Sequence, residues 1–229
     1  MRLTFSIVFF LFTALLFGQE KPKVDVISDT LHYLEQINEN PNTEMVNLEN
    51  FVPGIKPDIR FATKNNPSGR NLYPSAEVFV RRPLAVSLNI IQETLNRRGL
   101  GLIIFDAYRP YSAAKRINIQ MKDSKYERLF ENSINHSRGA SVDVSLIDLS
   151  TGEEIQMPSD YCQNNPAAKV SFKDLPDNVL ENRNILIEVM QQHGFRVNPN
   201  QWWHFDFMGW QAFSLMDLSF EELENIYNK

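Results

Sequence analysis

Between residues 83 and 207 the chain alternates segments of helical and of strand periodicity, and this alternation constrains the fold more than any other feature of the sequence. Three segments have the apolar spacing of helices, namely residues 83–98, 112–130 and 178–193. Short apolar or alternating runs predict strands at residues 59–63, 101–106, 141–149, 195–197 and 202–207. Residues 156–176 contain three prolines and predict a long loop. We therefore predict an α+β fold, in which a mostly antiparallel sheet is flanked by helices within a single domain.

The composition limits how such a fold can be stabilised and what it can bind. Hydrophobic residues make up 43% of the chain, which is enough for a sizeable core. Cys162 is the only cysteine, so no internal disulfide can form, and the fold must rest on its core or on a metal. The net charge of −5 gives no sign of the basic patch of a nucleic-acid-binding protein, and we expect no such partner.

The first 18 residues have the pattern of a signal peptide. Arg2 supplies a positive charge, residues 3–17 are almost all apolar, and Gly18 is a small residue at a plausible cleavage site. A membrane anchor is the alternative, but a spanning helix needs roughly 20 apolar residues and this run is shorter. We therefore expect cleavage, a periplasmic or secreted protein, and no stable membrane span afterwards. Residues 19–44 are predicted to be a polar extension with a short helix near residues 29–37, and residues 45–229 the functional domain.

The chain has four histidines, and their settings differ. His32 lies in the polar N-terminal stretch, where we expect it to be solvated. His193 stands before a glycine at the end of a predicted helix, where a histidine interacts favourably with the helix dipole. Both are predicted to be structural, which leaves His136 and His204 as candidates for chemistry.

His136, Asp143 and His204 could together hold a metal ion. Asp143 lies among apolar residues of a predicted strand, where an unpaired carboxylate would be costly to bury. A turn at Gly139 would let the chain fold back, so that His136 meets Asp143. Two histidines and one carboxylate with an open fourth position form a common catalytic zinc site. The alternative is a hydrogen-bonded core histidine with a salt-bridged aspartate. A third possibility, a nucleophilic Cys162, has no accompanying Cys-His signature.

Three sequence segments resemble the D-alanyl-D-alanine dipeptidases, the family that includes the vancomycin-resistance dipeptidase and is related to the D,D-carboxypeptidases and the hedgehog signalling domain. These segments are FDAYRP at 105–110, HSRGASVD at 136–143 and WWHFD at 202–206. They occur in the order and spacing of the family, and the resemblance extends from about residue 47 to residue 207. The segment DIRFAT at 58–63 resembles the first strand of the family.

The resemblance implies a function and assigns residues to it. It places the zinc ligands at His136, Asp143 and His204, with one zinc ion per chain, and implies a small D-amino-acid dipeptide as substrate. It places the arginine that stabilises the transition state at Arg109, since a fixed guanidinium can stabilise negative charge on the carbonyl oxygen. Without the resemblance, a salt bridge to Asp106 would be the expected role of Arg109. Asp206 could support His204, or it could simply be a surface charge.

The chain departs from the family at the general base. The family has a glutamate three residues before its last histidine ligand, and this chain has Gln201. A glutamine amide can hydrogen-bond a water molecule but cannot accept its proton. Two smaller departures are Ile134 and Ser141, where the family usually has serine and alanine.

Two functional hypotheses follow from these residues. The chain is a zinc dipeptidase that takes another base from the loop at 158–176, from Glu127 or from Glu131. Alternatively, it is a catalytically impaired relative that binds zinc and either cell-wall peptides or a partner protein.

Overall fold

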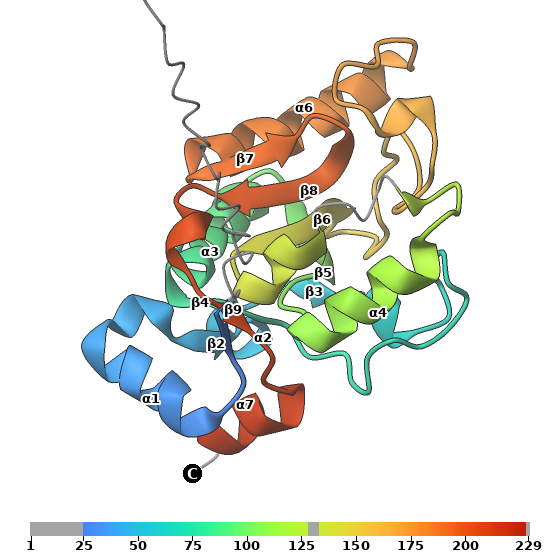
Figure 1. The fold of residues 1–229 in the computed structure, drawn as a ribbon. Coiled ribbons are helices and arrows are strands. Elements are labelled where there is room, and N and C mark those ends of the chain that lie inside the picture. Colours follow the sequence, from blue (N-terminus) through green and yellow to red (C-terminus); the bar gives the residue numbers. More distant parts are fainter. Residues whose placement is uncertain (1–24, 128–132, 228–229) are drawn as a thin grey trace, which may run out of the picture.

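A five-stranded mixed sheet forms the centre of the molecule (Figure 1). The computed structural model describes residues 25–127 and 133–227, so the predicted signal peptide lies outside the described residues. The strand order is β3 (Lys56–Pro57), β5 (Leu100–Asp106), β6 (Ser141–Asp148), β8 (Gln201–Phe207) and β7 (Phe195–Asn198). Neighbouring strands are antiparallel except β3 and β5, which are parallel. The α+β prediction is confirmed, with a sheet that is mixed rather than purely antiparallel.

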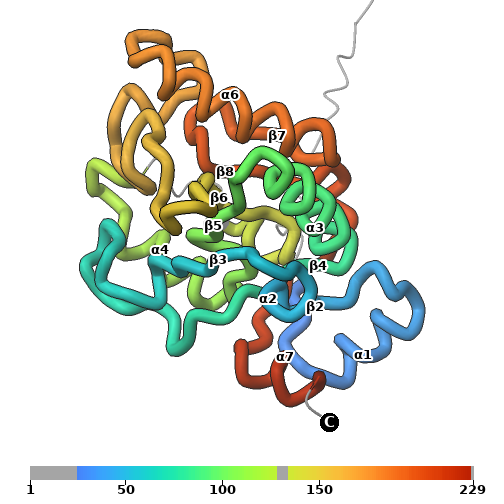
Figure 2. The backbone as a smooth tube through the Cα atoms, turned by 180° about the vertical axis from the view of Figure 1, so that it is seen from behind, coloured from blue at the N-terminus to red at the C-terminus, as the bar shows by residue number. Residues whose placement is uncertain are grey.

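Helices α3 (Arg82–Asn96) and α6 (Asp177–Gln192) cover one face of this sheet, the nearer face in Figure 2. The apolar positions that predicted α3 are all buried, as are those of α6: Leu84, Leu88, Ile91 and Leu95 in the former, and Leu186, Val189 and Met190 in the latter. Helix α4 (Tyr111–Met121) and the 3₁₀ helix η3 (Ser133–Arg138) contact each other on the opposite side (Figure 1). The site residues described below lie near this second side, where η3 contacts β6.

The two ends of the described chain meet at one end of the molecule (Figure 1). β1 (Val26–Ile27) pairs in parallel with β9 (Leu215–Met216), and α1 (Thr30–Glu39) lies beside α7 (Phe220–Tyr227). The hydroxyls of Tyr33 and Tyr227 lie 2.7 Å apart, and the Tyr33 hydroxyl also accepts a hydrogen bond from the backbone of Met45. The helix predicted near residues 29–37 is therefore present as α1, and residues 25–44 pack against the rest of the fold.

The remaining elements are short. β2 (Met45–Asn47) pairs antiparallel with β4 (Phe79–Arg81), and α2 (Leu48–Phe51) follows β2. The other 3₁₀ helices are η1 (Pro41–Thr43), η2 (Arg60–Ala62), η4 (Pro166–Ala168) and η5 (Trp210–Ala212). None of the helices in residues 25–127 and 133–227 has the length and apolar character needed to cross a membrane.

Two predicted elements differ from the structure. The residues predicted as a strand at 59–63 form the 3₁₀ helix η2 instead, in which the backbone amide of Thr63 donates to the carbonyl of Arg60. Ile59, just before η2, and Phe61, within it, are both buried. A tight turn buries alternate residues as a strand does, and this similarity misled the prediction. The helix predicted from residue 112 ends at Met121, because the backbone leaves the helical conformation at Lys122, with ψ 139°, and is left-handed at Asp123, with φ 58°. Residues 128–130 of that prediction lie outside the described chain.

Candidate metal centre

Strand register brings three of the site's side chains to one level of the sheet. Asp143 of β6 stands opposite His204 of β8 and, across the other edge, opposite Asp106 of β5. Directly opposed residues share a face of the sheet and contact each other. The sheet itself therefore fixes two of the predicted metal ligands, and it adds Asp106, which the sequence suggested only as a partner of Arg109.

The third candidate ligand, His136, reaches the site through the turn predicted at Gly139. Gly139 has φ 66°, a left-handed conformation, and its amide donates to the carbonyl of His136 at 2.9 Å. The Gly139 carbonyl in turn accepts from the amide of Arg81 at 2.8 Å. The chain folds back at this point, so that His136 on η3 faces Asp143 at the start of β6.

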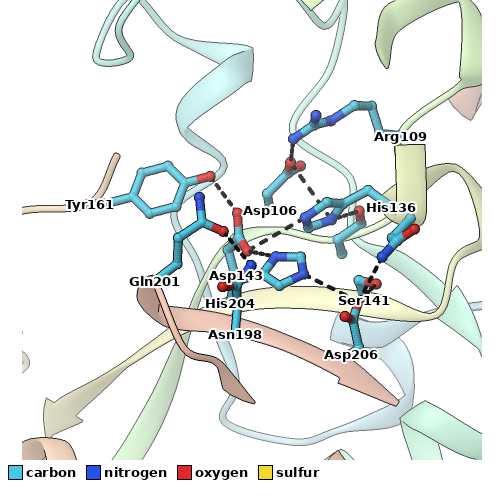
Figure 3. A network of polar contacts seen from close by, with 12 residues as sticks. Asp106, Arg109, His136, Ser141, Asp143, Tyr161, Asn198, Gln201, His204 and Asp206 are labelled. Carbon is cyan, nitrogen blue, oxygen red and sulfur yellow. Dashed lines mark hydrogen bonds and ion pairs between the residues drawn. The ribbon is translucent and has the colours of Figure 1, made fainter. Parts of the chain in front are cut away.

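The three side chains converge on a common point (Figure 3). Asp143 Oδ1 lies 2.8 Å from His204 Nδ1 and 3.5 Å from His136 Nε2. One ligand atom from each residue lies within 4.8 Å of the other two, and all three residues are buried. In a tetrahedral zinc site the bonds of about 2.0–2.1 Å put neighbouring ligand atoms about 3.3 Å apart. The donor types and their spacing fit zinc.

Outer hydrogen bonds leave the correct nitrogen of each histidine directed at the centre. His136 Nδ1 donates to the Ala107 carbonyl at 2.8 Å, which leaves Nε2 as the nitrogen available to a metal. His204 Nε2 lies 3.2 Å from Asp206 Oδ1, which leaves Nδ1 as the nitrogen available to a metal. Asp206 also accepts a hydrogen bond from the hydroxyl of Ser141 at 2.6 Å. Asp206 thus contacts His204, and the departure from the family at Ser141 adds a partner for Asp206.

The electrostatics of the cluster favour positive charge at its centre. Burial alone would raise the pKa of Asp143, but the charge of His136 and the hydrogen bonds of both histidines hold it well below its usual range. Burial alone would lower the pKa of His204, but the hydrogen bonds to Asp143 and Asp206 outweigh burial and raise this pKa from 6.5 to about 10. The pKa of Asp206 is also lowered, because His204 outweighs the effect of burial. Two ionised carboxylates therefore flank His204.

Arg109 is buried beside this cluster, with Asp106 between it and His136 (Figure 3). It forms a salt bridge to Asp106 and donates from Nε to the Tyr73 hydroxyl at 2.8 Å. Its guanidinium lies over the ring of Phe61. Arg109 Nη1 is buried without a hydrogen-bond partner among the described residues. The salt bridge expected from sequence is present, and the guanidinium still has one donor group to offer a ligand.

Gln201, at the first position of β8, lies at the edge of the same cluster (Figure 3). Its side chain is buried, and Oε1 accepts a hydrogen bond from Asn198 at 3.2 Å. Asn198 and Gln201 are paired across the β7–β8 turn, at an irregularity in the ladder. The side-chain amide of Gln201 is thus held by that of Asn198 and lies beside Asp143 and His204 (Figure 3).

The long loop at 156–176 contributes a residue that the sequence did not single out. The hydroxyl of Tyr161 donates to Asp143 Oδ2 at 2.7 Å, and burial raises the pKa of Tyr161 well above its usual value, so the hydroxyl stays protonated. The loop carboxylate nearest in sequence, Asp160, is exposed and accepts from Gln163. The loop supplies a phenol rather than the base anticipated from sequence. Position 161 carried no signal, because a loop has no periodicity.

A cleft of about 730 Å³ runs along this loop. Its lining is mostly polar and includes Arg60, Lys64, Glu154, Asp160, Tyr161 and Cys162. Cavities of this size accommodate small-molecule ligands. Tyr161 lines the cleft and also donates a hydrogen bond to Asp143, whereas His136, Asp143 and His204 do not line the cleft.

The other sequence candidates take no part in the cluster. Burial raises the pKa of the Cys162 thiol well above its usual value, which keeps it a poor nucleophile. Glu127 is exposed and accepts a hydrogen bond from the backbone of Asp123, whereas Glu131 lies outside the described residues. His32 is half-buried on α1, and His193 caps the C-terminus of α6.

The fold and the site together define an α+β protein with a candidate catalytic metal centre. Comparison with known proteins identifies the family. A family model described as D-Ala-D-Ala dipeptidase matches residues 41–222, which is most of the chain. The chain therefore belongs to the D-Ala-D-Ala dipeptidase family, a family of hydrolases, and the resemblance predicted from the three motifs is confirmed.

Individual relatives agree with this assignment. The D-alanyl-D-alanine dipeptidase of Escherichia coli (strain K12) is 29% identical over 168 residues, covering 72% of this chain and 84% of that protein. The enzymes of the same name from Streptomyces coelicolor and Enterococcus faecium are each 28% identical over 178 residues, covering 69% of this chain and 88% of theirs.

Proposed function

We propose that this chain binds one zinc ion through His136, Asp143 and His204, and that the centre acts on a small D-amino-acid dipeptide such as D-Ala-D-Ala. The convergence of the three buried candidate ligand atoms, with an outer hydrogen bond orienting each of the two histidines, is the observation that carries this proposal. When bound, zinc supplies Lewis-acid chemistry, which polarises a peptide carbonyl and lowers the pKa of water. The names of the relatives support the choice of dipeptide.

The chain's own residues can position the substrate and stabilise charge. The free Nη1 donor of Arg109 suits an oxygen that becomes negative as the peptide bond is attacked. The salt bridge to Asp106 and the hydrogen bond to Tyr73 hold the guanidinium in one orientation. A group fixed in this way need not reorganise during the reaction, which is the source of its effect on the rate.

Proton transfer is the step for which this chain is poorly equipped. An amide at position 201 can donate or accept a hydrogen bond, but it cannot take a proton from the attacking water or pass one to the leaving amine. The carboxylates around the centre are already engaged: Asp106 by Arg109, Asp143 by the two histidines and Asp206 by His204. A general acid-base group contributes about 10²–10⁴-fold in rate. We therefore propose a second function for which Gln201 is the specific support, namely binding of cell-wall-derived dipeptides with slow hydrolysis.

The two functions are separated by measuring D-alanine release from D-Ala-D-Ala with the zinc-loaded protein. Gln201→Glu should release D-alanine at least about 100-fold faster than the wild type, because it restores the base. Gln191→Glu, an equivalent change on the exposed surface of α6, is the matched control and should match the wild type. A wild-type rate equal to that of Gln201→Glu would show that the native chain has another base. No zinc binding by either protein would refute the metal proposal.

We further propose that the protein acts in the periplasm or after secretion, where cell-wall peptides occur. The apolar segment at residues 3–17 with Arg2 before it supports export. Mass spectrometry of the protein made in a bacterial host should give a mature chain that starts at Gln19. A mature chain that still begins at Met1 would contradict this location.

A further inference from the structure

The two oxygens of the Asp143 carboxylate have different partners (Figure 3). Oδ1 faces the centre, at 2.8 Å from His204 Nδ1 and 3.5 Å from His136 Nε2. Oδ2 points the other way and accepts the hydroxyl hydrogen of Tyr161 at 2.7 Å. The hydrogen bond therefore occupies the oxygen that is not directed at the two histidines.

Aromatic packing fixes the ring of Tyr161. The ring centroids of Phe105, Trp203 and Phe61 lie 4.8, 5.6 and 6.5 Å from that of Tyr161. These three rings come from β5, β8 and η2, so the phenol is held against the sheet that carries Asp143. Aromatic pairs at such separations add to the stabilisation that burial alone provides. The hydroxyl thus has little freedom to leave Asp143.

The loop backbone on both sides of Tyr161 is also held in place. Ser159 accepts a hydrogen bond from the indole of Trp202 at 3.1 Å, and Asn164 donates to the backbone carbonyl of Lys125 at 2.6 Å. Cys162, the residue after Tyr161, has φ 57°, which is a strained conformation for a residue with a side chain. Such strain persists only where the surrounding structure enforces it, and it is common at functional sites.

We propose that Tyr161 is a positioning residue that makes Asp143 a one-oxygen metal ligand. This inference rests on the proposed zinc site. A carboxylate with both oxygens available can bind a metal through one or through both, and a hydrogen bond to one oxygen favours the first mode. Residues that hydrogen-bond to metal ligands in this way set the orientation of the ligand and the affinity of the site. With Asp143 held to one oxygen, the fourth position stays available to the substrate.

The test compares Tyr161→Phe with the wild type in metal binding. The substitution removes only the hydroxyl, so the aromatic packing remains. Affinity for Zn²⁺, measured by competition with a chromophoric chelator, should fall by about 10–100-fold, the usual effect of losing an outer partner. Co²⁺ should bind to the variant with weaker visible absorption, because Oδ2 becomes free to bind and a higher coordination number reduces the intensity.

Tyr108→Phe is the matched control. Tyr108 is buried and donates from its hydroxyl to the carbonyl of Leu218 at 2.8 Å, so its loss removes a similar hydrogen bond from the core. It should lower thermal stability but leave Zn²⁺ affinity and the Co²⁺ spectrum unchanged. If Tyr161→Phe matches the wild type in both measurements, or if Tyr108→Phe loses as much affinity, the positioning role is refuted. If the wild type binds neither ion, the zinc proposal itself fails, and this separates the two failures.

Discussion

Gly139 is the residue at which an added methyl group should most disturb the turn that brings His136 to the metal centre. Its backbone has φ 66°, and a left-handed conformation costs a residue with a Cβ roughly 1–2 kcal/mol. A Cβ built at this position would lie 2.6 Å from both Sδ and Cε of Met45, which is itself buried. Relief of such overpacking costs about 1–3 kcal/mol more. Gly139→Ala should therefore lower the free energy of unfolding by about 2–5 kcal/mol.

Urea unfolding of the metal-free protein measures this loss, and Gly152→Ala is the matched control. Gly152 has φ 73°, but a Cβ there would meet nothing within 4 Å. Gly152→Ala should therefore cost only the conformational part, roughly 1–2 kcal/mol. In a Met45→Ala background, Gly139→Ala should cost little more than Gly152→Ala, since the clash is gone. Equal losses for the two glycine variants in the native background would refute the packing argument.

Two further changes test groups near the centre, and a third tests a carboxylate elsewhere in the fold. Asp206→Asn should weaken zinc binding by about 10–100-fold, measured by chelator competition, since the charged partner of His204 is lost; an unchanged affinity would make Asp206 only a surface charge. Cys162→Ala should leave zinc affinity and D-alanine release unchanged, because a thiol whose pKa is raised by burial is not the nucleophile; abolished D-alanine release with intact zinc binding would revive the cysteine hypothesis. Burial, followed by the carboxylate of Glu224, raises the pKa of Glu77 above its ordinary value of 4.5. The protonated side chain therefore stabilises the fold below pH 4.5, and this stabilisation is lost as the pH rises through the raised pKa. Glu77→Gln should reduce that loss in urea unfolding measured across this pH range, and an unchanged pH profile would contradict the assignment.

The parts of the site that the sequence predicted are those with a local signal. Strands β5, β6 and β8 are marked by short apolar or alternating runs, and the three predicted ligands all lie on or beside β6 and β8. The fold-back at Gly139 was predictable, because a glycine between a histidine and a strand indicates a turn. The spacing of the residues therefore indicated the three candidate ligands. The family resemblance favoured a metal site over a hydrogen-bonded core histidine with a salt-bridged aspartate.

The parts that the sequence did not predict depend on contacts between distant segments. Tyr161 reaches Asp143 only because the loop docks on β5 and β8, and no pattern within the loop indicates this. Ser141 counted as a departure from the family, yet register pairs it with Asp206 across β6 and β8. Cross-strand register of this kind cannot be obtained from one sequence, since it is set by the whole sheet.

Zinc stoichiometry is the measurement that tests the central claim most directly. The purified protein, dialysed free of excess metal, should retain one zinc ion per chain by elemental analysis, and so should His193→Ala, whose histidine caps α6 away from the cluster. His136→Ala and His204→Ala should each lose stoichiometric, tight binding, since each removes one of three converging ligands. If His136→Ala still binds one zinc ion as tightly as the wild type, the metal centre described for this fold is wrong.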